Sequence, residues 1–184
     1  MKNQCAFTLI EIIIVLAIIS VLSMIAIPGL QTLLRKAQDD AAQADILRMV
    51  EIARSEALLL RQTVTLCKSR DQRTCSGEWS EGQIVFVDPV QDGVVRDRSQ
   101  VIAVNKMKNK GGDLRARFYP RYREFIQFNS MLAENDDNGT FWLCHVGSAL
   151  PVWAIKISKS GSAHVLLPDR NGEIKDKAGR VMMC

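Results

Sequence analysis

The first third of the chain carries hydrophobic residues in a pattern of helical period. From Phe7 to Ile27 every residue is apolar except for four, namely Thr8, Glu11, Ser20 and Ser23. At a rise of about 1.5 Å per residue, a helix of this length reaches roughly 30 Å, which is the thickness of a bilayer core. The pattern therefore predicts a helix that spans a membrane.

Beyond Pro28-Gly29 the apolar residues recur at steps of three and four, which indicates a second, amphipathic helical stretch. Its expected stripe consists of Leu30, Leu33, Leu34, Ala37, Ala41, Ala44, Leu47, Val50, Ala53 and Ala57. We expect the helix to end near Arg61 and to kink at Pro28, because proline removes one backbone hydrogen bond. The alanine-rich stripe favours packing on a sheet over a coiled coil.

From Gln62 onward the hydrophobic period changes to two, which predicts strands separated by turn clusters. The expected strands are 63–67, 83–88, 100–105, 114–118, 124–128, 140–144, 152–158 and 163–167. Because no helix is expected between them, the sheet should be antiparallel. The predicted fold class is α+β: a long kinked N-terminal helix, membrane-spanning in its first half, packed on an antiparallel β domain.

One acidic residue, Glu11, lies inside the apolar run. A carboxylate in a lone membrane span costs on the order of 2.5–3.5 kcal/mol, so such a residue usually marks a function and a partner. A secretory signal would have a shorter apolar core and a small-residue cleavage site, and no such site occurs before Pro28. A plain membrane anchor is the alternative interpretation.

The stretch "AFTLIEIIIVLAIISVL" resembles the class III leader junction of type IV pilins and type II secretion pseudopilins. The resemblance implies cleavage by a prepilin peptidase between Ala6 and Phe7, followed by methylation of the new amine on Phe7. It also implies that Glu11 pairs with the N-terminal amine of a neighbouring subunit during assembly, in a filament core of low dielectric. The family usually has glycine where this chain has Ala6, which predicts slower processing or a tolerant peptidase.

Two later stretches resemble the GspH/FimT-type minor pilins, namely "VTLCKSRDQRTCSGEWSEGQIVFVD" (64–88) and "IQFNSMLAENDDNGTFWLC" (126–144). The expected organisation is a leader peptide (1–6), a transmembrane and assembly half-helix (7–29), an amphipathic half-helix (30–61) and a globular β domain (62–184). The chain would then be a single-pass protein of the bacterial inner membrane with a periplasmic domain, displayed on a pilus after assembly.

The chain has five cysteines, and Cys5 falls in the predicted leader. An even set of four in an exported domain favours disulfides. Of the three pairings, we favour Cys67–Cys75, which closes a short loop, and Cys144–Cys184, which would hold the C-terminal tail. A four-thiolate zinc site is the alternative, but no CxxC pair is present and export disfavours it.

The formal net charge of +4 is only mildly basic and identifies no partner. Neither His145 nor His164 lies in a motif around a nucleophile, so we expect no catalytic residues, no metal and no cofactor. One stretch, "KMKNKGGDLRARFYPRYR" (106–123), combines aromatic residues with seven basic ones: Lys106, Lys108, Lys110, Arg115, Arg117, Arg121 and Arg123.

Cationic side chains interleaved with aromatic rings are typical of non-specific DNA binding. If Leu114, Ala116 and Phe118 face inward, Arg115 and Arg117 share the outer face of one strand. The plainer alternative is a solvated hairpin or a contact with an acidic neighbouring subunit.

The resemblance to FimT-like proteins also suggests where to look for a DNA contact, because some of these proteins use a Gly-Arg-x-Arg segment near the C-terminus. At the corresponding strand-turn this chain has "SGSAH" (160–164), and the later "GRVMMC" (179–184) has Met182 in place of the second arginine. A substitute basic surface would combine the hairpin with Lys175, Lys177 and Arg180, held in place through Cys184.

These observations predict a non-catalytic minor pilin of a type IV pilus that acts in assembly, in priming or at the tip. A DNA-binding role in uptake and a place in a type II secretion system as a minor pseudopilin are the alternatives. The expected partners are other pilin or pseudopilin subunits, the prepilin peptidase, the inner membrane and double-stranded DNA.

Overall fold

The computed structural model describes residues 8–107, 112–120, 123–130, 137–176 and 178–184. The chain divides into two compact units, Met1–Ala37 and Gln38–Cys184. The division falls inside the long helix, just before Asp39, the first helical residue that the structure describes as buried.

The helix α1 covers Leu9–Leu60, 52 residues in all. Thr8 caps its start: the Thr8 hydroxyl accepts a hydrogen bond from the Glu11 backbone N–H at 3.3 Å, and the Thr8 carbonyl accepts from the same N–H at 3.1 Å. The next residue after the helix, Arg61, has a φ of 51° and turns the chain into the first strand. The predicted end of the helix near Arg61 is therefore confirmed.

In the first unit, the described large apolar side chains of α1 are exposed. Their exposed fractions run from 49% at Val15 to 78% at Leu9. By length and composition, no single helix among the described residues qualifies as a membrane span, whereas the bent pair Leu9–Met24 and Gly29–Leu60 qualifies when taken together. The bend of 42° falls at the residues that include Pro28, as the sequence predicts.

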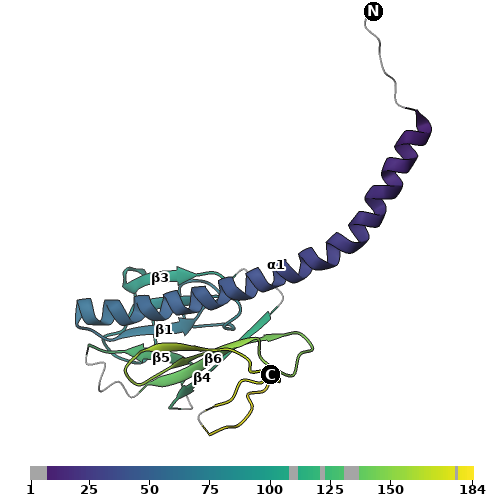
Figure 1. Ribbon diagram of the computed structural model, residues 1–184. Helices are drawn as coiled ribbons and strands as arrows, with labels where there is room; N and C mark the ends of the chain where they lie inside the picture. Colours follow the sequence, from purple (N-terminus) through teal and green to yellow (C-terminus); the bar gives the residue numbers. More distant parts are fainter. Residues whose placement is uncertain (1–7, 108–111, 121–122, 131–136, 177) are drawn as a thin grey trace, which may run out of the picture. The chain divides into compact units, whose positions relative to one another are not determined.

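The second unit contains two four-stranded antiparallel sheets. The first has the order β3-β2-β1-β5, with β1 at Val64–Lys68, β2 at Gln83–Val87, β3 at Val101–Asn105 and β5 at Phe125–Phe128. The second has the order β4-β6-β7-β8, with β4 at Gly112–Tyr119, β6 at Asn138–His145, β7 at Trp153–Ile157 and β8 at Ala163–Leu166. A short 3-10 helix, η1 (Arg98–Gln100), precedes β3. All eight predicted strands are present, and the α+β class is confirmed (Figure 1).

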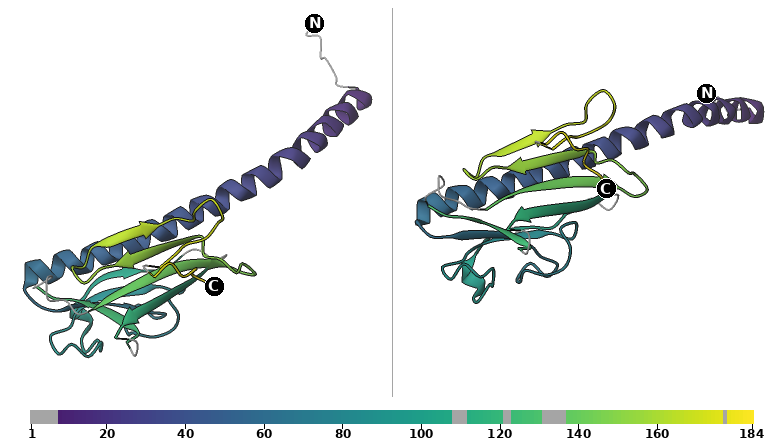
Figure 2. Two further views of the ribbon diagram at one scale, coloured as in Figure 1. Left: turned by 60° about the horizontal axis from the view of Figure 1, so that its bottom comes forward. Right: turned by 90° about the horizontal axis from the view of Figure 1, so that it is seen from below.

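One core joins the C-terminal half of α1 to both sheets, and this part of the helix lies along the strands (Figure 2). The helix contributes its buried face to this core: Ala42, Ile46, Met49, Val50, Ala53 and Ala57. Ala41 and Ala44 belong to the predicted stripe but are exposed, so that part of the prediction is wrong. The larger apolar side chains of Ile46 and Met49 decide which face packs, and at about 100° per residue the two alanines lie on the opposite side.

Each sheet also has a smaller apolar cluster outside this main core. In the first sheet the cluster consists of Cys67, Ile84 and Phe86, with Cys75 packed against it. In the second it consists of Trp142, Cys144, Ala154 and Ile174, with Met182 and Cys184 packed against it. Both clusters therefore depend on segments that a disulfide could hold in place.

Candidate functional site

Of the N-terminal candidate residues, the structure describes Glu11, which lies at the start of α1. Glu11 is exposed in the first turn, where a carboxylate interacts favourably with the positive end of the helix dipole. With Thr8 as the capping residue, Glu11 occupies the third helical position, which glutamate favours in a capping box. The local structure thus accounts for an acid at this position. Ala6 and Phe7 lie outside the described residues.

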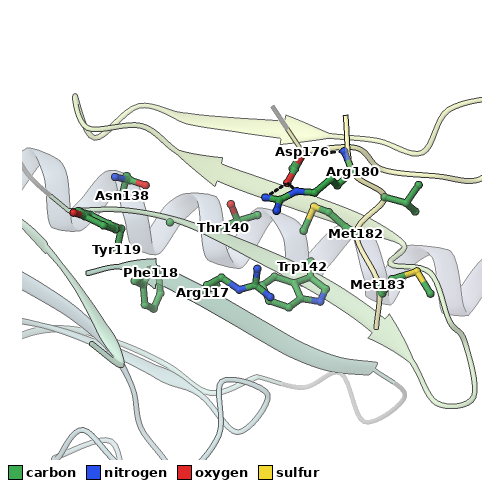
Figure 3. Close-up of a pocket in the computed structure, with 12 residues that line it drawn as sticks. Arg117, Phe118, Tyr119, Asn138, Thr140, Trp142, Asp176, Arg180, Met182 and Met183 are labelled. Atoms are coloured by element: carbon green, nitrogen blue, oxygen red, sulfur yellow. Dashed lines mark hydrogen bonds and ion pairs between the residues drawn. The ribbon is translucent and has the colours of Figure 1, made fainter. Parts of the chain in front are cut away.

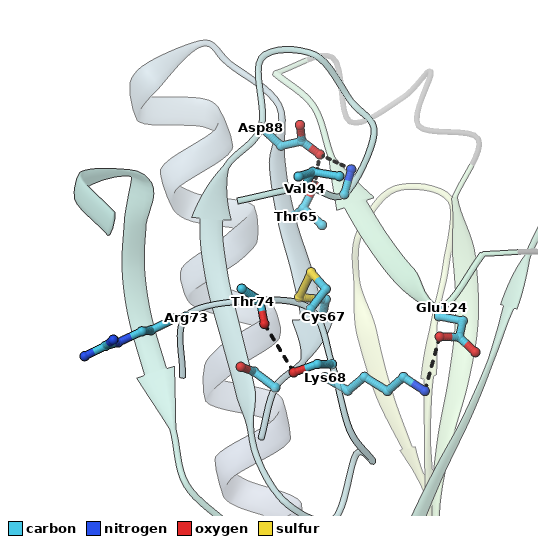
Figure 4. Close-up of a disulfide and its surroundings, with 12 residues drawn as sticks. Thr65, Cys67, Lys68, Arg73, Thr74, Asp88, Val94 and Glu124 are labelled. Atoms are coloured by element: carbon cyan, nitrogen blue, oxygen red, sulfur yellow. Dashed lines mark hydrogen bonds and ion pairs between the residues drawn. A yellow bond between two sulfur atoms is a disulfide. The ribbon is translucent and has the colours of Figure 1, made fainter. Parts of the chain in front are cut away.

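Cys67 and Cys75 form a disulfide with a Cα–Cα distance of 5.6 Å (Figure 4). Inside the loop that they close, the Asp71 carboxylate accepts hydrogen bonds from the backbone N–H groups of Thr74 and Arg73, each at 2.9 Å. The hydroxyls of Thr74 and Ser69 donate to the same carboxylate. These bonds, the Thr74 N–H first, hold the pKa of Asp71 well below its usual range.

Cys144 and Cys184 form the second disulfide, with a Cα–Cα distance of 5.8 Å. The Cys184 backbone N–H donates to the Ala149 carbonyl at 2.9 Å, and the Cys184 carbonyl accepts from Arg115 Nη1 at 2.7 Å. Both disulfides join the pairs that the sequence analysis favours. The second one holds the C-terminal segment against the outer face of the second sheet, where it covers Trp142.

Strand β4 places its side chains as the alternation predicts. Leu114 and Phe118 are buried, whereas Arg115 and Arg117 are exposed. Arg115 and Arg117 therefore share the outer face of the strand.

Most of the described basic candidates make ion pairs with acids. The shortest N–O distances are 2.7 Å for Arg115 with Asp113, 2.9 Å for Arg123 with Asp137, 2.8 Å for Arg180 with Asp176, and 3.1 Å for Lys175 with Glu173. These acids neutralise much of the positive charge that the sequence places in this region. Lys106 is exposed beside β3, and Lys108, Lys110, Arg121 and Lys177 lie outside the described residues.

Arg117 differs from these residues. Its guanidinium carbon lies 5.7 Å from the centre of the Trp142 ring, a cation–π contact. Within the described part of the chain, no acid forms an ion pair with Arg117. Its positive charge therefore remains available to a ligand.

Arg117 and Arg180 line one groove of about 470 Å³, which we call the Trp142 groove (Figure 3). Strands β4 and β6 contribute Arg117, Tyr119, Asn138, Thr140 and Trp142 to it, and the C-terminal segment contributes Asp176, Arg180, Val181, Met182 and Met183. Gly139 also lines it, and a Cβ there would lie 2.2 Å from Phe118 Cδ1. The structure thus brings the outer face of β4 beside the C-terminal segment, as the substitute basic surface requires. Arg117 and Trp142 also line a second groove, which brings Arg117 together with Arg115, Arg123 and Lys68 and with the acids Glu78, Asp113 and Glu124.

The indole of Trp142 has a feature that the sequence analysis missed. Trp142 is 8% exposed, and its Nε1 is buried without a hydrogen-bond partner among the described residues. The sequence contains one signal for this feature. Trp142 stands two residues before Cys144 in the same strand, so both side chains point to the same face of the sheet.

A second missed feature is the buried carboxylate of Asp39, which does not belong to the predicted apolar stripe of the helix. Asp39 is 5% exposed; its Oδ1 lies 3.0 Å from His145 Nε2, and its backbone carbonyl accepts from Trp153 Nε1 at 3.0 Å. No local signal identifies this residue, because its partners come from β6 and β7. Its contacts attach α1 to the second sheet and do not resemble a catalytic arrangement.

Across the described ranges, no three histidine, cysteine, aspartate or glutamate side chains cluster in a way that could hold a metal ion. The sulfurs of the four described cysteines are bonded in pairs, as described above.

Comparison with protein families agrees with this arrangement. The family model described as Type II transport protein GspH matches residues 41–161, about two thirds of the chain. The chain belongs to this GspH family. A second model, the prokaryotic N-terminal methylation motif, matches residues 1–27 and covers the predicted leader and the start of α1.

Two crystal structures of the type IV minor pilin FimU of Pseudomonas aeruginosa share the fold of this GspH-family chain. The first covers 76% of this chain and 93% of the FimU chain, with 17% identity and a TM-score of 0.53. The second covers 73% and 95%, with 17% identity and a TM-score of 0.50. No curated protein matches the chain.

Minor pilins and pseudopilins are structural, non-catalytic subunits, which agrees with the non-catalytic role that the sequence analysis expects. The methylation motif implies processing by a prepilin peptidase and interaction with other pilins. The apolar start of α1 fits a membrane-anchored pilin with a periplasmic domain.

Proposed function

We propose that this GspH-family chain is a minor pilin of a type IV pilus, present sparsely or at the tip, that helps to prime or assemble the filament. The observation that carries the proposal is the combination of a methylation motif over residues 1–27 with a fold shared with the type IV minor pilin FimU. The two disulfides add support, because the pattern of two cysteine pairs resembles the pilus subfamily.

In this proposal the prepilin peptidase removes residues 1–6 and the new N-terminus, Phe7, is methylated. Residues 7–29 anchor the subunit in the inner membrane as a single pass, residues 30–61 continue the helix, and residues 62–184 form the periplasmic domain. The exposed apolar side chains from Leu9 to Leu34 support this role, because an apolar surface of this size marks a membrane or protein interface.

Glu11 would serve as the assembly carboxylate. It is the acidic residue of the first helical turn and is exposed in the isolated chain, so it can meet the amine of a neighbouring subunit. Within the apolar filament core, this pair would be stronger than the same pair in water, because the surrounding dielectric is low.

The alternative is a minor pseudopilin of a type II secretion system, which would share the same leader and fold. Deletion of the gene separates the two machines. We expect the deletion strain to lose surface pili, counted by electron microscopy and in sheared fractions, while protein export stays normal. Normal piliation with a loss of secreted proteins would instead assign the chain to the secretion system.

Binding of double-stranded DNA stays a prediction. The residues assigned to it are Lys106, Lys108, Lys110, Arg115, Arg117, Arg121, Arg123, Lys175, Lys177 and Arg180. Two observations favour it: Arg117 and Arg180 share one groove, and Arg115, Arg117 and Arg123 share a second one. The observation against a dense cationic surface is the ion pairing of Arg115, Arg123, Lys175 and Arg180.

A further inference from the structure

We propose that the Trp142 groove binds a peptide segment of a partner protein that carries a carboxylate beside apolar side chains, with Arg117 as the ion-pair partner of that carboxylate. This proposal goes beyond the filament role and does not depend on which machine the chain serves.

The first argument is the balance of charge in the groove. Arg180 is neutralised by Asp176, which it contacts through Nε at 2.9 Å and Nη2 at 2.8 Å. The Asp176 carboxylate also accepts the backbone N–H groups of Ala178 and Arg180, so its acceptor capacity is largely used. These bonds, that from the Arg180 N–H first, lower the pKa of Asp176 and keep it ionised. Arg117 is thus the guanidinium in this groove that is left for an anion.

The second argument is the excess of hydrogen-bond donors. The Trp142 Nε1–H is buried without an acceptor among the described residues, and a buried donor without a partner is unfavourable. Thr140 and Asn138 line the same groove and offer a hydroxyl and an amide. A ligand rich in acceptors would accept from the Thr140 hydroxyl and the Asn138 amide, and a carboxylate can take two parallel bonds from one guanidinium.

The third argument is the apolar wall opposite Arg117. Val181, Met182 and Met183 line the groove from the C-terminal segment, and Met183 is 61% exposed (Figure 3). Unbranched methionine side chains adapt to the shape of a ligand at low cost. A ligand that is only an anion would leave this wall uncovered, whereas an apolar side chain next to the carboxylate would bury it.

The count of free cations favours a peptide over duplex DNA. Duplex binding draws its affinity from several phosphate contacts, each made by an available cation. Here the Trp142 groove holds one guanidinium without an ion pair, that of Arg117, and the carboxylate of Asp176 also lines the groove. The single available guanidinium of Arg117 suits a ligand with one carboxylate. It is too few cations for the row of phosphates on a DNA duplex.

The test follows the indole N–H resonances of the full-length chain in detergent micelles, labelled with ¹⁵N at tryptophan. The three tryptophans provide three indole signals, and Trp142→Phe assigns the one of interest. Trp153 is the internal control, because its Nε1–H already donates to the Asp39 carbonyl. The probes are a blocked peptide of alternating leucine and aspartate, and the matched peptide with asparagine in place of aspartate.

We expect the acidic peptide to shift the Trp142 signal in a saturable way and to leave the Trp153 signal in place. Arg117→Gln should weaken binding at least tenfold, and Arg117→Lys should weaken it less, because lysine keeps the charge but loses the two-pronged geometry. Arg98→Gln is the matched control, since Arg98 is exposed on η1 and outside the groove, and it should change nothing.

Three results would overturn the proposal. Equal shifts with the acidic and the amide peptide would show that the carboxylate is not recognised. Unchanged binding in Arg117→Gln, with the Trp153 signal intact as evidence of folding, would remove Arg117 from the site. A shift produced equally well by acetate or by a short DNA duplex would indicate a simple anion site or a phosphate site.

Discussion

Asp39 of helix α1 and His145 at the end of β6 meet at 3.0 Å, although 106 positions separate them in the chain. Because Asp39 is buried, its removal would leave the His145 ring without this partner. We expect Asp39→Ala to lower the free energy of unfolding by about 1–3 kcal/mol. The exposed neighbour serves as control: Asp40→Ala should have almost no effect in the same denaturant titration.

A double-mutant cycle tests the pair directly. We expect Asp39→Ala and His145→Ala to be coupled by about 0.5–3 kcal/mol, as is usual for residues in contact. Strictly additive effects would mean that the contact contributes nothing to stability and that the burial of Asp39 has another cause.

The disulfide between Cys144 and Cys184 closes a separation of 40 residues. Replacing both with serine should lower the free energy of unfolding by about 4 kcal/mol, compared with about 2.5 kcal/mol for Cys67 and Cys75, whose separation is 8. Loss of the Cys144–Cys184 bond should also increase the quenching of Trp142 fluorescence, because the C-terminal segment covers Trp142. Equal quenching in the two double-serine variants would contradict this role of the segment.

Processing and assembly test the N-terminal assignments. Mass spectrometry of the membrane fraction should find an N-methylated Phe7, and an intact N-terminus in peptidase-positive cells would refute the processing step. Glu11→Val should insert into the membrane as well as the wild type, because it removes a charge from the apolar run, yet enter sheared filaments much less. Normal incorporation of this variant would show that Glu11 does not pair with a neighbouring amine.

The depressed pKa of Asp71 predicts a pH dependence. A carboxyl whose pKa is lower in the folded state stabilises the fold above its unfolded pKa of about 3.9, and that contribution is lost as the pH falls toward the folded pKa. Asp71→Asn should therefore lower the free energy of unfolding at neutral pH, and the difference from wild type should shrink in acid below about pH 4. A difference from wild type that stays constant between neutral and acid pH would contradict this role of the Asp71 carboxylate.

DNA binding can be tested with a gel shift on the fragment from Leu30 onward, at about 50 and about 200 mM salt. If the surface binds duplex, Arg115→Ala, Arg117→Ala and Arg180→Ala should each weaken binding and reduce the salt slope by about one. Arg98→Ala is the control. A complete lack of shift at low salt, or a shift indifferent to all three changes, would remove DNA from the list of partners.

Much of the fold can be predicted from local sequence patterns. Apolar residues recur at steps of three and four up to Arg61 and at every second position afterwards, which identifies α1 and all eight strands. An element that buries one face needs apolar residues at the spacing of its backbone repeat. The outer-face position of Arg115 and Arg117 follows from the same alternation along β4. The leader and the family motifs are also short continuous stretches of sequence, which is why the resemblance to the GspH family is visible before the fold is known.

The partners of individual polar groups were decided by the tertiary structure alone. Arg123 reads as part of a basic hairpin, yet it pairs with Asp137, a residue from another segment that is only 3% exposed. Asp39 does not belong to the predicted apolar stripe, yet it is buried, with His145 of β6 and Trp153 of β7 as its partners. Ala41 and Ala44 belong to the predicted stripe, but the helix packs on the face that carries the larger Ile46 and Met49. Packing on this face buries more apolar surface area. Periodicity specifies which face of an element is apolar, whereas an ion pair or a groove requires segments that are distant in sequence to meet, and that depends on how the sheets and the C-terminal segment pack.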